Sequence, residues 1–292
     1  MSGAHPAEEP PGLSILAGRS NLVLRIVSSL VLAPVAIAAA WFGGAVFVAF
    51  WAIAAVIVLW EWQTLVCGHD RNSVLTVGAA ALIGAAAVLI VGWFGIAMAL
   101  VALGGFGIAA LASRERRAWC VAGLVYAAAL LIAPVLLRRD AAFGFAAIML
   151  LFVIVWLTDT AAYFAGRAIG GPKLMPRVSP KKTWSGAVGG TLAGVLGAVG
   201  VAHTSGVANL VAVAGVALVI SVASQAGDLL ESAIKRRFNT KDASQLIPGH
   251  GGLMDRLDGF VTAALAAALI GLAHSSISGG GLHAPARGLM VW

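Results

Sequence analysis

The chain has 292 residues, of which 60% are hydrophobic and only 11% are charged, and its formal net charge is +7. A soluble domain carries about 25% charged residues, so this composition excludes an ordinary water-soluble protein. At roughly 20 apolar residues for each crossing, the chain has room for about eight to ten membrane helices. The alternating ten-residue segments of an outer-membrane barrel are not found. The sequence therefore predicts an all-α, polytopic transmembrane helical bundle.

Nine apolar segments follow one another along the chain, and most charged residues lie in the gaps between them. The segments span residues 22–42, 45–66, 74–91, 94–112, 119–137, 142–163, 186–203, 207–232 and 256–274. Each is close to the length that one crossing of the hydrocarbon core requires. We therefore expect about nine transmembrane helices.

The distribution of polar residues divides the chain into four parts. Residues 1–21 are polar and proline-rich, and we expect them to form a disordered cytoplasmic N-terminus. Residues 22–141 have few polar residues inside the apolar segments, which is typical of scaffold helices. Residues 142–274 contain six of the twelve acidic residues and two long basic gaps, and we interpret them as a C-terminal catalytic region with two basic cytoplasmic loops. Residues 275–292 form a tail.

The basic residues indicate an orientation in the membrane. Sixteen of the nineteen Lys and Arg residues lie on the side of the N-terminus and of the gaps after the second, fourth, sixth and eighth segments. Because such residues accumulate on the cytoplasmic side of membrane helices, we expect an N-in/C-out protein of a bacterial-type inner membrane, with its active site facing the cytoplasm. This placement also accounts for the positive charge without a nucleic-acid partner.

The chain has two cysteines, Cys67 and Cys120. They have no CxxC or metal-ligand spacing, and the orientation above places both near the reducing side of the membrane. Disulfides are rare in that compartment. We therefore expect two separate packing residues and no disulfide.

The most informative stretch is residues 232–258, which combines basic residues, a glycine turn and two carboxylates. Lys235, Arg236, Arg237 and Lys241 precede the turn, which contains His250, Gly251 and Gly252, and Asp255, Arg256 and Asp258 follow it. The i, i+3 spacing puts Asp255 and Asp258 on one helix face, where carboxylates suit a hard divalent cation that is shared with substrate phosphates. Glycines let backbone N–H groups approach an anion closely.

Each of these features has a simpler explanation when it is taken alone. The cluster from Lys235 to Arg237 is typical of charges that flank a membrane helix, and Asp255 and Asp258 also suit the positive end of a helix dipole. His250 in a loop fits a surface histidine. Their occurrence together within one short stretch favours a site for phosphates and a metal ion.

A second group of polar residues supports the same interpretation. Asp228 lies in the eighth apolar segment and Asp159 lies one turn inside the end of the sixth. Carboxylates at bilayer depth are unfavourable and are usually functional, although Asp228 is near enough to the helix end to reach water. Asp159 needs a partner, either a cation or a lysine of the following gap. That gap contains Lys181, Lys182 and Thr183, which can donate to an anion.

Five short motifs resemble those of the phosphatidate cytidylyltransferase family. Residues 232–258 match S-x-x-K-R-x4-K-D and P-x-H-G-G-x-x-D-R-x-D, and the upstream elements match D-x-x-A-Y-F-x-G-R, S-P-K-K-T-W-x-G and Q-x-G-D. The resemblance covers roughly residues 155–270, whereas the first half is similar only in hydrophobic character. One departure is Ser185, at a position where many members carry Glu.

The resemblance implies transfer of a cytidylyl group from CTP to phosphatidic acid, which gives CDP-diacylglycerol and pyrophosphate. It implies Mg²⁺ as cofactor, with a second, monovalent cation such as K⁺ left open. The implied catalytic residues are Asp228, Asp255, Asp258 and Lys235, and the three aspartates are the implied metal ligands. The implied substrate-binding residues are Asp159, Lys181, Lys182, Thr183, Arg236, Lys241, His250, Gly251, Gly252 and Arg256.

Two alternative functions remain open from the sequence. A CTP-dependent lipid kinase would share the nucleotide and the metal but would transfer the γ-phosphoryl group. An ion-coupled transporter would use the intramembrane carboxylates, but it leaves the basic glycine loop unexplained. Glycines 186, 190, 194 and 197 suit close helix packing, either inside the bundle or between the two subunits of a homodimer.

Overall fold

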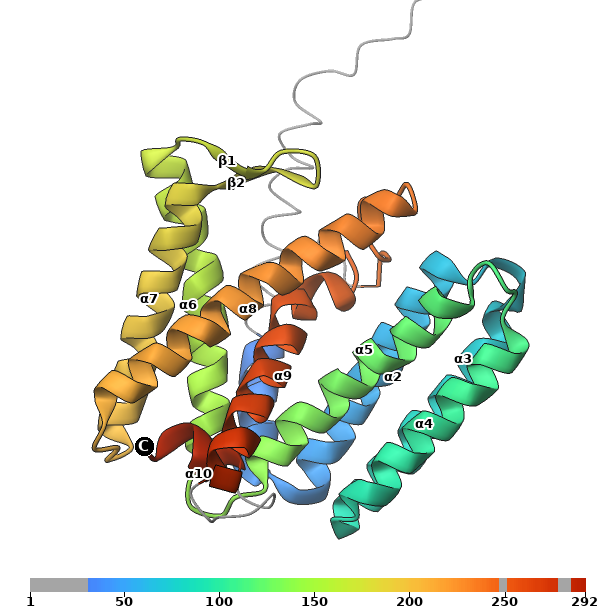
Figure 1. The fold of residues 1–292 in the computed structure, drawn as a ribbon, viewed down its shortest axis with the longest axis horizontal. Coiled ribbons are helices and arrows are strands. Elements are labelled where there is room, and N and C mark those ends of the chain that lie inside the picture. The colour runs from blue at the N-terminus through green and yellow to red at the C-terminus, as the bar shows by residue number, and fades with distance from the viewer. Residues whose placement is uncertain (1–30, 247–250, 278–284) are drawn as a thin grey trace, which may run out of the picture.

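The computed structural model describes residues 31–246, 251–277 and 285–292, which form a bundle of helices with one small hairpin (Figure 1). The helices are Val31–Phe42, α2 (Gly44–Val66), the short η1 (Gly68–Asp70), α3 (Arg71–Val91), α4 (Phe94–Leu111), α5 (Arg117–Arg138), α6 (Gly144–Ile169), α7 (Trp184–Thr204), α8 (Leu210–Arg237), α9 (Met254–Ile277) and α10 (Pro285–Met290). Within these described ranges, eight helices are long and apolar enough to cross a membrane. The prediction of a polytopic all-α bundle is confirmed.

The first expected crossing, residues 22–42, is described only from Val31 onward, where it is helical. The predicted disordered N-terminus lies outside the described residues. At the other end of the chain, α9 continues to Ile277, and the expected tail contains α10, which packs against α9.

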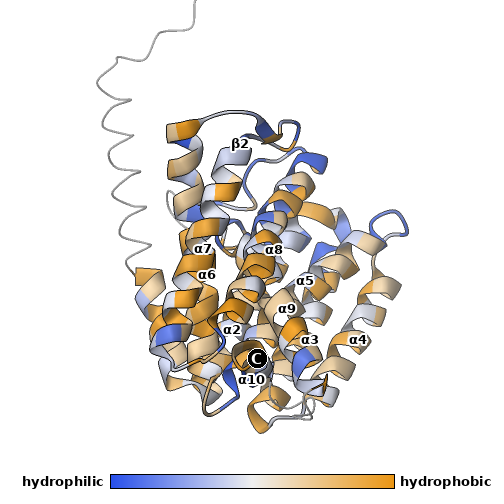
Figure 2. Ribbon diagram, turned by 60° about the vertical axis from the view of Figure 1, so that its left-hand side comes forward, coloured by the Kyte–Doolittle hydropathy of each residue, from blue (hydrophilic) through white to orange (hydrophobic). Residues whose placement is uncertain are grey.

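The helices are arranged in two groups with α9 between them (Figure 1). The hairpin, α6, α7 and α8 lie on one side, and α2 to α5 lie on the other. The α9 helix packs against both α8 and α5. The hairpin and the connections after α2, α4 and α8 lie at one end of the bundle, which we call the polar end. Figure 2 shows hydrophobic residues along the helices and hydrophilic residues around the hairpin and the neighbouring helix ends.

Two helices extend well beyond the C-terminal end that the apolar pattern predicts. The α6 helix runs to Ile169, so that Asp159 lies well inside it and not one turn from its end. The α8 helix runs to Arg237, which places Lys235 in the last turn of a helix and not in the following loop. The extension of α8 is stabilised because Glu231 and Lys235 form an i, i+4 ion pair, and because positive charges favour the C-terminal end of a helix.

The expected basic loop between α6 and α7 forms an antiparallel hairpin. Its strands are β1 (Lys173–Met175) and β2 (Ser179–Thr183), and Lys173 lies opposite Thr183. Thr183 ends the hairpin and begins the next helix, since its Oγ1 accepts a hydrogen bond from the backbone N–H of Gly186 at 3.1 Å. This is a standard N-cap interaction, and it fixes the direction in which β2 enters α7.

The glycines of α7 bring this helix against α6. A Cβ at Gly190 would lie 2.5 Å from the carbonyl oxygen of Thr158, and one at Gly186 would lie 2.7 Å from that of Ala162. Such contacts are too short for any side chain, so glycine permits the two backbones to meet. The glycines therefore serve packing inside the bundle, and the homodimer stays a prediction.

The expectation of two separate cysteines is wrong. The structure joins Cys67 and Cys120 in a disulfide between the end of α2 and the first turn of α5. The two positions are 53 residues apart in sequence, but α2 packs against α5 and their Cα atoms are 6.0 Å apart. Sequence spacing gave no sign of this pairing because it depends on which helices become neighbours.

The close approach of α6 and α7 predicts that one added methyl group destabilises the protein. We expect Gly190→Ala to lower the free energy of unfolding by about 2 kcal/mol, the usual effect of overpacking a tight contact. Gly200→Ala on the same helix is the matched control, because no described atom outside the local backbone lies within 4 Å of the added carbon. Thermal unfolding of the detergent-purified variants measures the difference, and equal midpoints would contradict the prediction.

Candidate active site

A cavity of about 560 Å³ opens at the polar end between α6, α7, α8 and the hairpin. Its size lies within the range of about 300–1,000 Å³ that is typical of small-molecule sites. The charged side chains that line it are Asp159, Arg167, Lys173, Lys181, Lys182 and Asp228. Four cations and two carboxylates therefore surround one cavity, which suits a ligand that carries several negative charges.

The wall of this cavity is held together by polar contacts between the helices. Thr158 of α6 and Ser221 of α8 share a hydrogen bond of 2.8 Å. Gln225 of α8 donates to Thr191 Oγ1 of α7 at 2.8 Å. Because lipid provides no hydrophobic force between helices, such bonds together with close packing set the arrangement of these helices.

Lys182 and Asp228 form an ion pair across the cavity. The lysine comes from β2 and the aspartate from α8, and both side chains are 29% exposed. The pair is thus accessible. A phosphate group could replace Asp228 as the partner of Lys182, and a cation could replace Lys182 as the partner of Asp228. The sequence predicted both residues as site residues. It also predicted a lysine of this segment, or a cation, as the partner of Asp159, but Lys182 pairs with Asp228.

A second ion cluster joins α8 to α9 beside the cavity. Lys235 Nζ lies 2.5 Å from Asp255 Oδ1 and 2.6 Å from Glu231 Oε2. Lys235 is 8% exposed and Glu231 is 1% exposed. The contact with Glu231 is an ion pair without the alignment of a hydrogen bond. One buried lysine therefore faces two buried carboxyl groups.

The carboxylate of Asp255 is held by two backbone N–H groups and by Lys235. Its carboxylate accepts hydrogen bonds from the backbone N–H of Gly252 at 2.8 Å and from that of Ala243 at 3.0 Å, in addition to the contact with Lys235. Hydrogen bonds to a charged group are the stronger kind. Asp255 therefore orders the loop before α9.

The glycine turn makes room for carboxylates of the protein itself. Gly251 has a φ of 84°, and a Cβ there would lie 2.9 Å from Asp255 Oδ2; a Cβ at Gly252 would lie 2.6 Å from Glu61 Oε1. The N–H of Gly252 is directed at Asp255 and not at an open space. In this structure the carboxylate of Asp255 accepts that N–H, and the predicted contact of the turn with a substrate anion stays a prediction.

Close packing places Asp258 beside the same region. A Cβ at Gly227 would lie 2.7 Å from the carbonyl oxygen of Asp258, and one at Gly259 would lie 2.6 Å from Ser224 Oγ. The α8 and α9 backbones therefore meet where Asp258 faces Gly227, the residue before Asp228. The carboxylate of Asp258 accepts a hydrogen bond from the N–H of Gly259 at 2.7 Å.

The donors present are consistent with a Mg²⁺ ion that comes with a phosphate ligand. Within the described part of the chain, no three His, Cys, Asp or Glu side chains are placed to hold a metal ion together. Mg²⁺ is ordinarily bound by one or two carboxylates, water and substrate phosphates. Asp228 and Asp258 fit that requirement better than Asp255, whose oxygens already accept several hydrogen bonds.

The other predicted residues lie in different surroundings. Arg236 donates to the carbonyl oxygen of Thr240 at 3.0 Å. Thr183, the buried cap of α7, also lines the first cavity. Lys241 and Arg256 are exposed at the polar end. His250 lies outside the described residues. Their roles in substrate binding stay predictions.

Several residues of the site were missed by the sequence reasoning. Arg167 and Tyr163 line the cavity, and the Arg167 guanidinium donates to the Tyr163 hydroxyl at 3.0 Å. Both belong to the D-x-x-A-Y-F-x-G-R motif, so the signal was present. Glu231 could have been found from its i, i+4 spacing to Lys235. Glu61 could have been found because a carboxylate within a membrane helix is rarely without function.

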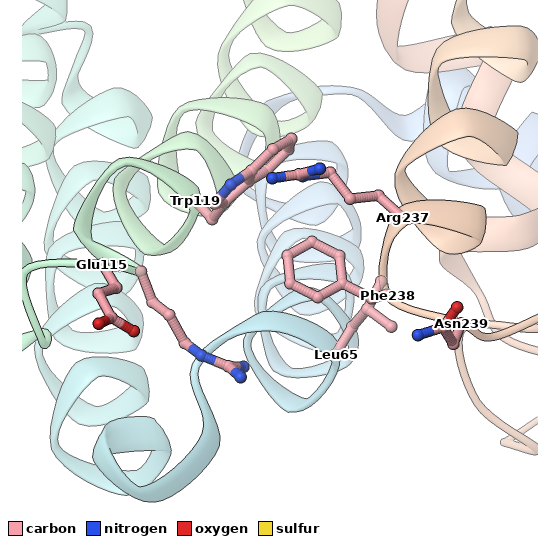
Figure 3. A pocket seen from close by; sticks show the side chains of 7 residues that line it. Leu65, Glu115, Trp119, Arg237, Phe238 and Asn239 are labelled. Carbon is pink, nitrogen blue, oxygen red and sulfur yellow. The ribbon is translucent and has the colours of Figure 1, made fainter.

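A second cavity, of about 500 Å³, lies at the polar end between α2, α5 and the end of α8 (Figure 3). The Arg237 guanidinium lies 5.8 Å from the centroid of the Trp119 ring, and Phe238 meets the same ring edge-on. Arg116 donates to the carbonyl oxygen of Val66 at 2.8 Å. These side chains contact one another, and the lining includes one carboxylate, Glu115. The first cavity therefore remains the candidate site.

Comparison with known proteins identifies the family. A model of the cytidylyltransferase family matches residues 23–273. A protein of Brucella suis that is named phosphatidate cytidylyltransferase is 41% identical over 274 residues, which cover 86% of this chain and 94% of the relative. The chain belongs to the cytidylyltransferase family. Proteins of the same name from Haemophilus influenzae and Staphylococcus aureus are 41% and 42% identical over 134 and 115 residues, covering 43% and 39% of this chain and 45% and 44% of the relatives.

In this cytidylyltransferase, the Lys235 cluster predicts a measurable loss of stability. We expect Lys235→Met to lower the free energy of unfolding by about 3 kcal/mol, because Glu231 and Asp255 would stay buried without a counter-charge. Arg236→Met is the matched control, because Arg236 is the next residue of the same helix and its side chain is exposed. Adding Glu231→Gln to Lys235→Met should recover part of the loss. Thermal unfolding midpoints in detergent test this, and a Lys235→Met protein as stable as Arg236→Met would contradict it.

Proposed function

We propose that this cytidylyltransferase transfers the cytidylyl group of CTP to phosphatidic acid and so produces CDP-diacylglycerol and pyrophosphate. The observation that carries the proposal is the 41% identity over 94% of the length of relatives named phosphatidate cytidylyltransferase. The family match over residues 23–273 supports it. The eight helices of the described residues that are long and apolar enough to cross a membrane also support it, because a lipid substrate resides in the bilayer.

The reaction requires positioning and neutralisation of charge more than covalent catalysis. A phosphate oxygen of phosphatidic acid attacks the α-phosphorus of CTP, and the bond from that phosphorus to the pyrophosphate group breaks. Because the nucleophile is already an anion, the protein mainly has to bring two anions together. The four cations of the first cavity, Arg167, Lys173, Lys181 and Lys182, serve this purpose in the proposal.

Lys182 has a particular part in this scheme. Its ammonium group pairs with Asp228 in the structure, and a triphosphate in the cavity would compete for it. Asp228 would then be free to bind a cation together with Asp258 from α9. The ion pair thus keeps both charges satisfied until the nucleotide binds.

Mg²⁺ is part of the proposal, with Asp228 and Asp258 as the residues that would hold it and Asp255 beside them. When bound, the ion would neutralise charge on the phosphate oxygens and so make the α-phosphorus more electrophilic. Asp255 and Lys235 would keep the start of α9 in place. A second, monovalent cation stays a prediction.

The protein is a multi-pass membrane protein, and we propose that its polar end faces the cytoplasm. The proposal rests on the sixteen Lys and Arg residues that the sequence assigns to one side. It places the Cys67–Cys120 disulfide on the reducing side, where such bonds are rare. CTP would then reach the cavity from the cytoplasm, while phosphatidic acid would arrive from the bilayer.

The activity is tested with purified protein and CTP that is labelled either at the α-phosphate or at the γ-phosphate. We expect the α-label to appear in the lipid fraction as CDP-diacylglycerol and the γ-label to appear in pyrophosphate, because the cytidylyl group is transferred. Removal of Mg²⁺ with a chelator should abolish product formation. Transfer of the γ-label to the lipid would identify a lipid kinase instead, and full activity without divalent cations would refute the metal assignment.

The orientation is tested by labelling single cysteines in intact cells. Ala208→Cys, in the connection between α7 and α8, should react with a membrane-impermeant thiol reagent, and Gln245→Cys, after α8, should not. Both positions are exposed and lie on opposite sides of one crossing. The Cys67→Ser/Cys120→Ser protein is the background and the control. Labelling of position 245 from outside would reverse the proposed orientation.

A further inference from the structure

Glu61 is a buried carboxylate of α2 that contacts the catalytic half of the chain. Its side chain is fully buried. It accepts hydrogen bonds from Ser244 Oγ at 2.6 Å, from the backbone N–H of Leu253 at 2.8 Å and from that of Met254 at 2.6 Å. All three donors belong to the segment between α8 and the first residue of α9, more than half of the chain away. Glu61 therefore links the scaffold helices to the loop of the candidate site.

The two backbone donors lie at the start of α9. The carbonyl oxygen of Leu253 accepts the first bonds of this helix, from the N–H groups of Arg256 and Leu257, so the N–H groups of Leu253 and Met254 have no partner within the helix. A carboxylate at this position satisfies them and is also attracted by the helix dipole. Glu61 thus caps α9 from a different helix.

The glycine turn fits between this carboxylate and Asp255. A Cβ at Gly252 would lie 2.6 Å from Glu61 Oε1, and one at Gly251 would lie 2.9 Å from Asp255 Oδ2. The N–H of Gly252 is donated to Asp255 and the next N–H, of Leu253, is donated to Glu61. The two carboxylates therefore hold consecutive amide groups of one turn, and the absence of side chains at the glycines allows both to approach.

We propose that Glu61 is a positioning residue of the active site. It holds the turn at residues 251–254, and through that turn it fixes the orientation of Asp255 and the contact of Asp255 with Lys235. Glu61 does not touch the substrate in this proposal. The inference rests on the proposed function for its kinetic consequence, whereas its structural consequence can be measured without any substrate.

The charge of Glu61 and its two equivalent oxygens are both required. Oε1 accepts from Ser244 and Leu253, and Oε2 accepts from Met254. In Glu61→Gln one of these oxygens becomes an NH₂ group, which is a donor and faces another donor. The substitution keeps the size of the side chain but loses at least one bond to the turn. A misplacement of catalytic groups by about 1 Å can reduce a rate on the order of a hundredfold.

The experiment compares Glu61→Gln with Gln63→Leu in the full-length, detergent-purified protein. Gln63 is also fully buried on α2, and its side-chain NH₂ donates to the carbonyl oxygen of Cys120 at 2.8 Å, away from the turn. Hydrogen exchange of the peptide that contains residues 251–258 is measured first. We expect exchange at Leu253 and Met254 to be at least about tenfold faster in Glu61→Gln, since each such bond protects its own amide, and to be unchanged in Gln63→Leu.

Steady-state kinetics with CTP and phosphatidic acid are measured on the same samples. We expect kcat of Glu61→Gln to fall on the order of a hundredfold with a much smaller change in KM for CTP, because the cations of the cavity are not moved. Gln63→Leu should keep kcat within about threefold. Faster exchange at the turn with an unchanged kcat would show that Glu61 only caps the helix, and it would overturn the proposal. Unchanged exchange at the turn in Glu61→Gln would also overturn it.

A second variant covers the case in which Glu61→Gln does not fold. Gly252→Ala keeps the charge of Glu61 but places a methyl group against its carboxylate, and it should also reduce kcat and loosen the turn. If neither variant folds, Glu61 serves the fold and the proposal is wrong. If the wild-type protein makes no CDP-diacylglycerol, the proposed function fails, while the exchange result still decides whether Glu61 holds the turn.

Discussion

The contact of Lys235 with Glu231 and Asp255 is the interaction on which the polar end of this protein depends. All three side chains are largely removed from water, so each charge is stable there only because an opposite charge is close. Two of them belong to α8 and one belongs to α9. The charges therefore help to fix how these two helices cross.

Glycines make that crossing and its neighbours close enough for polar groups to meet. Gly227 and Gly259 let α8 and α9 approach backbone to backbone, and Gly190 does the same for α7 and α6. In lipid, where apolar side chains gain little from association, such close contact is a main source of helix packing. The cavity and its charged lining follow from this geometry, because the hairpin that carries Lys182 is attached to α7.

The division of the chain into a scaffold half and a catalytic half holds only in part. The cationic cavity is built entirely from the second half. The start of α9, however, is held by Glu61 of α2, and α5 is linked to α2 by the Cys67–Cys120 disulfide. The first half thus contributes the frame against which the catalytic loop is ordered.

The sequence by itself determined the membrane helices and named four of the six charged residues that line the cavity, Asp159, Lys181, Lys182 and Asp228. Composition and apolar spacing predicted the crossings, because each helix in lipid must satisfy its own backbone hydrogen bonds, and the i, i+3 spacing of Asp255 and Asp258 predicted their common face. Only the tertiary structure decided which distant residues meet: Lys182 with Asp228, Cys67 with Cys120, and Glu61 with Met254, which is 193 positions away. These pairings follow from which helices pack together, and a local pattern of residues does not specify which helices become neighbours.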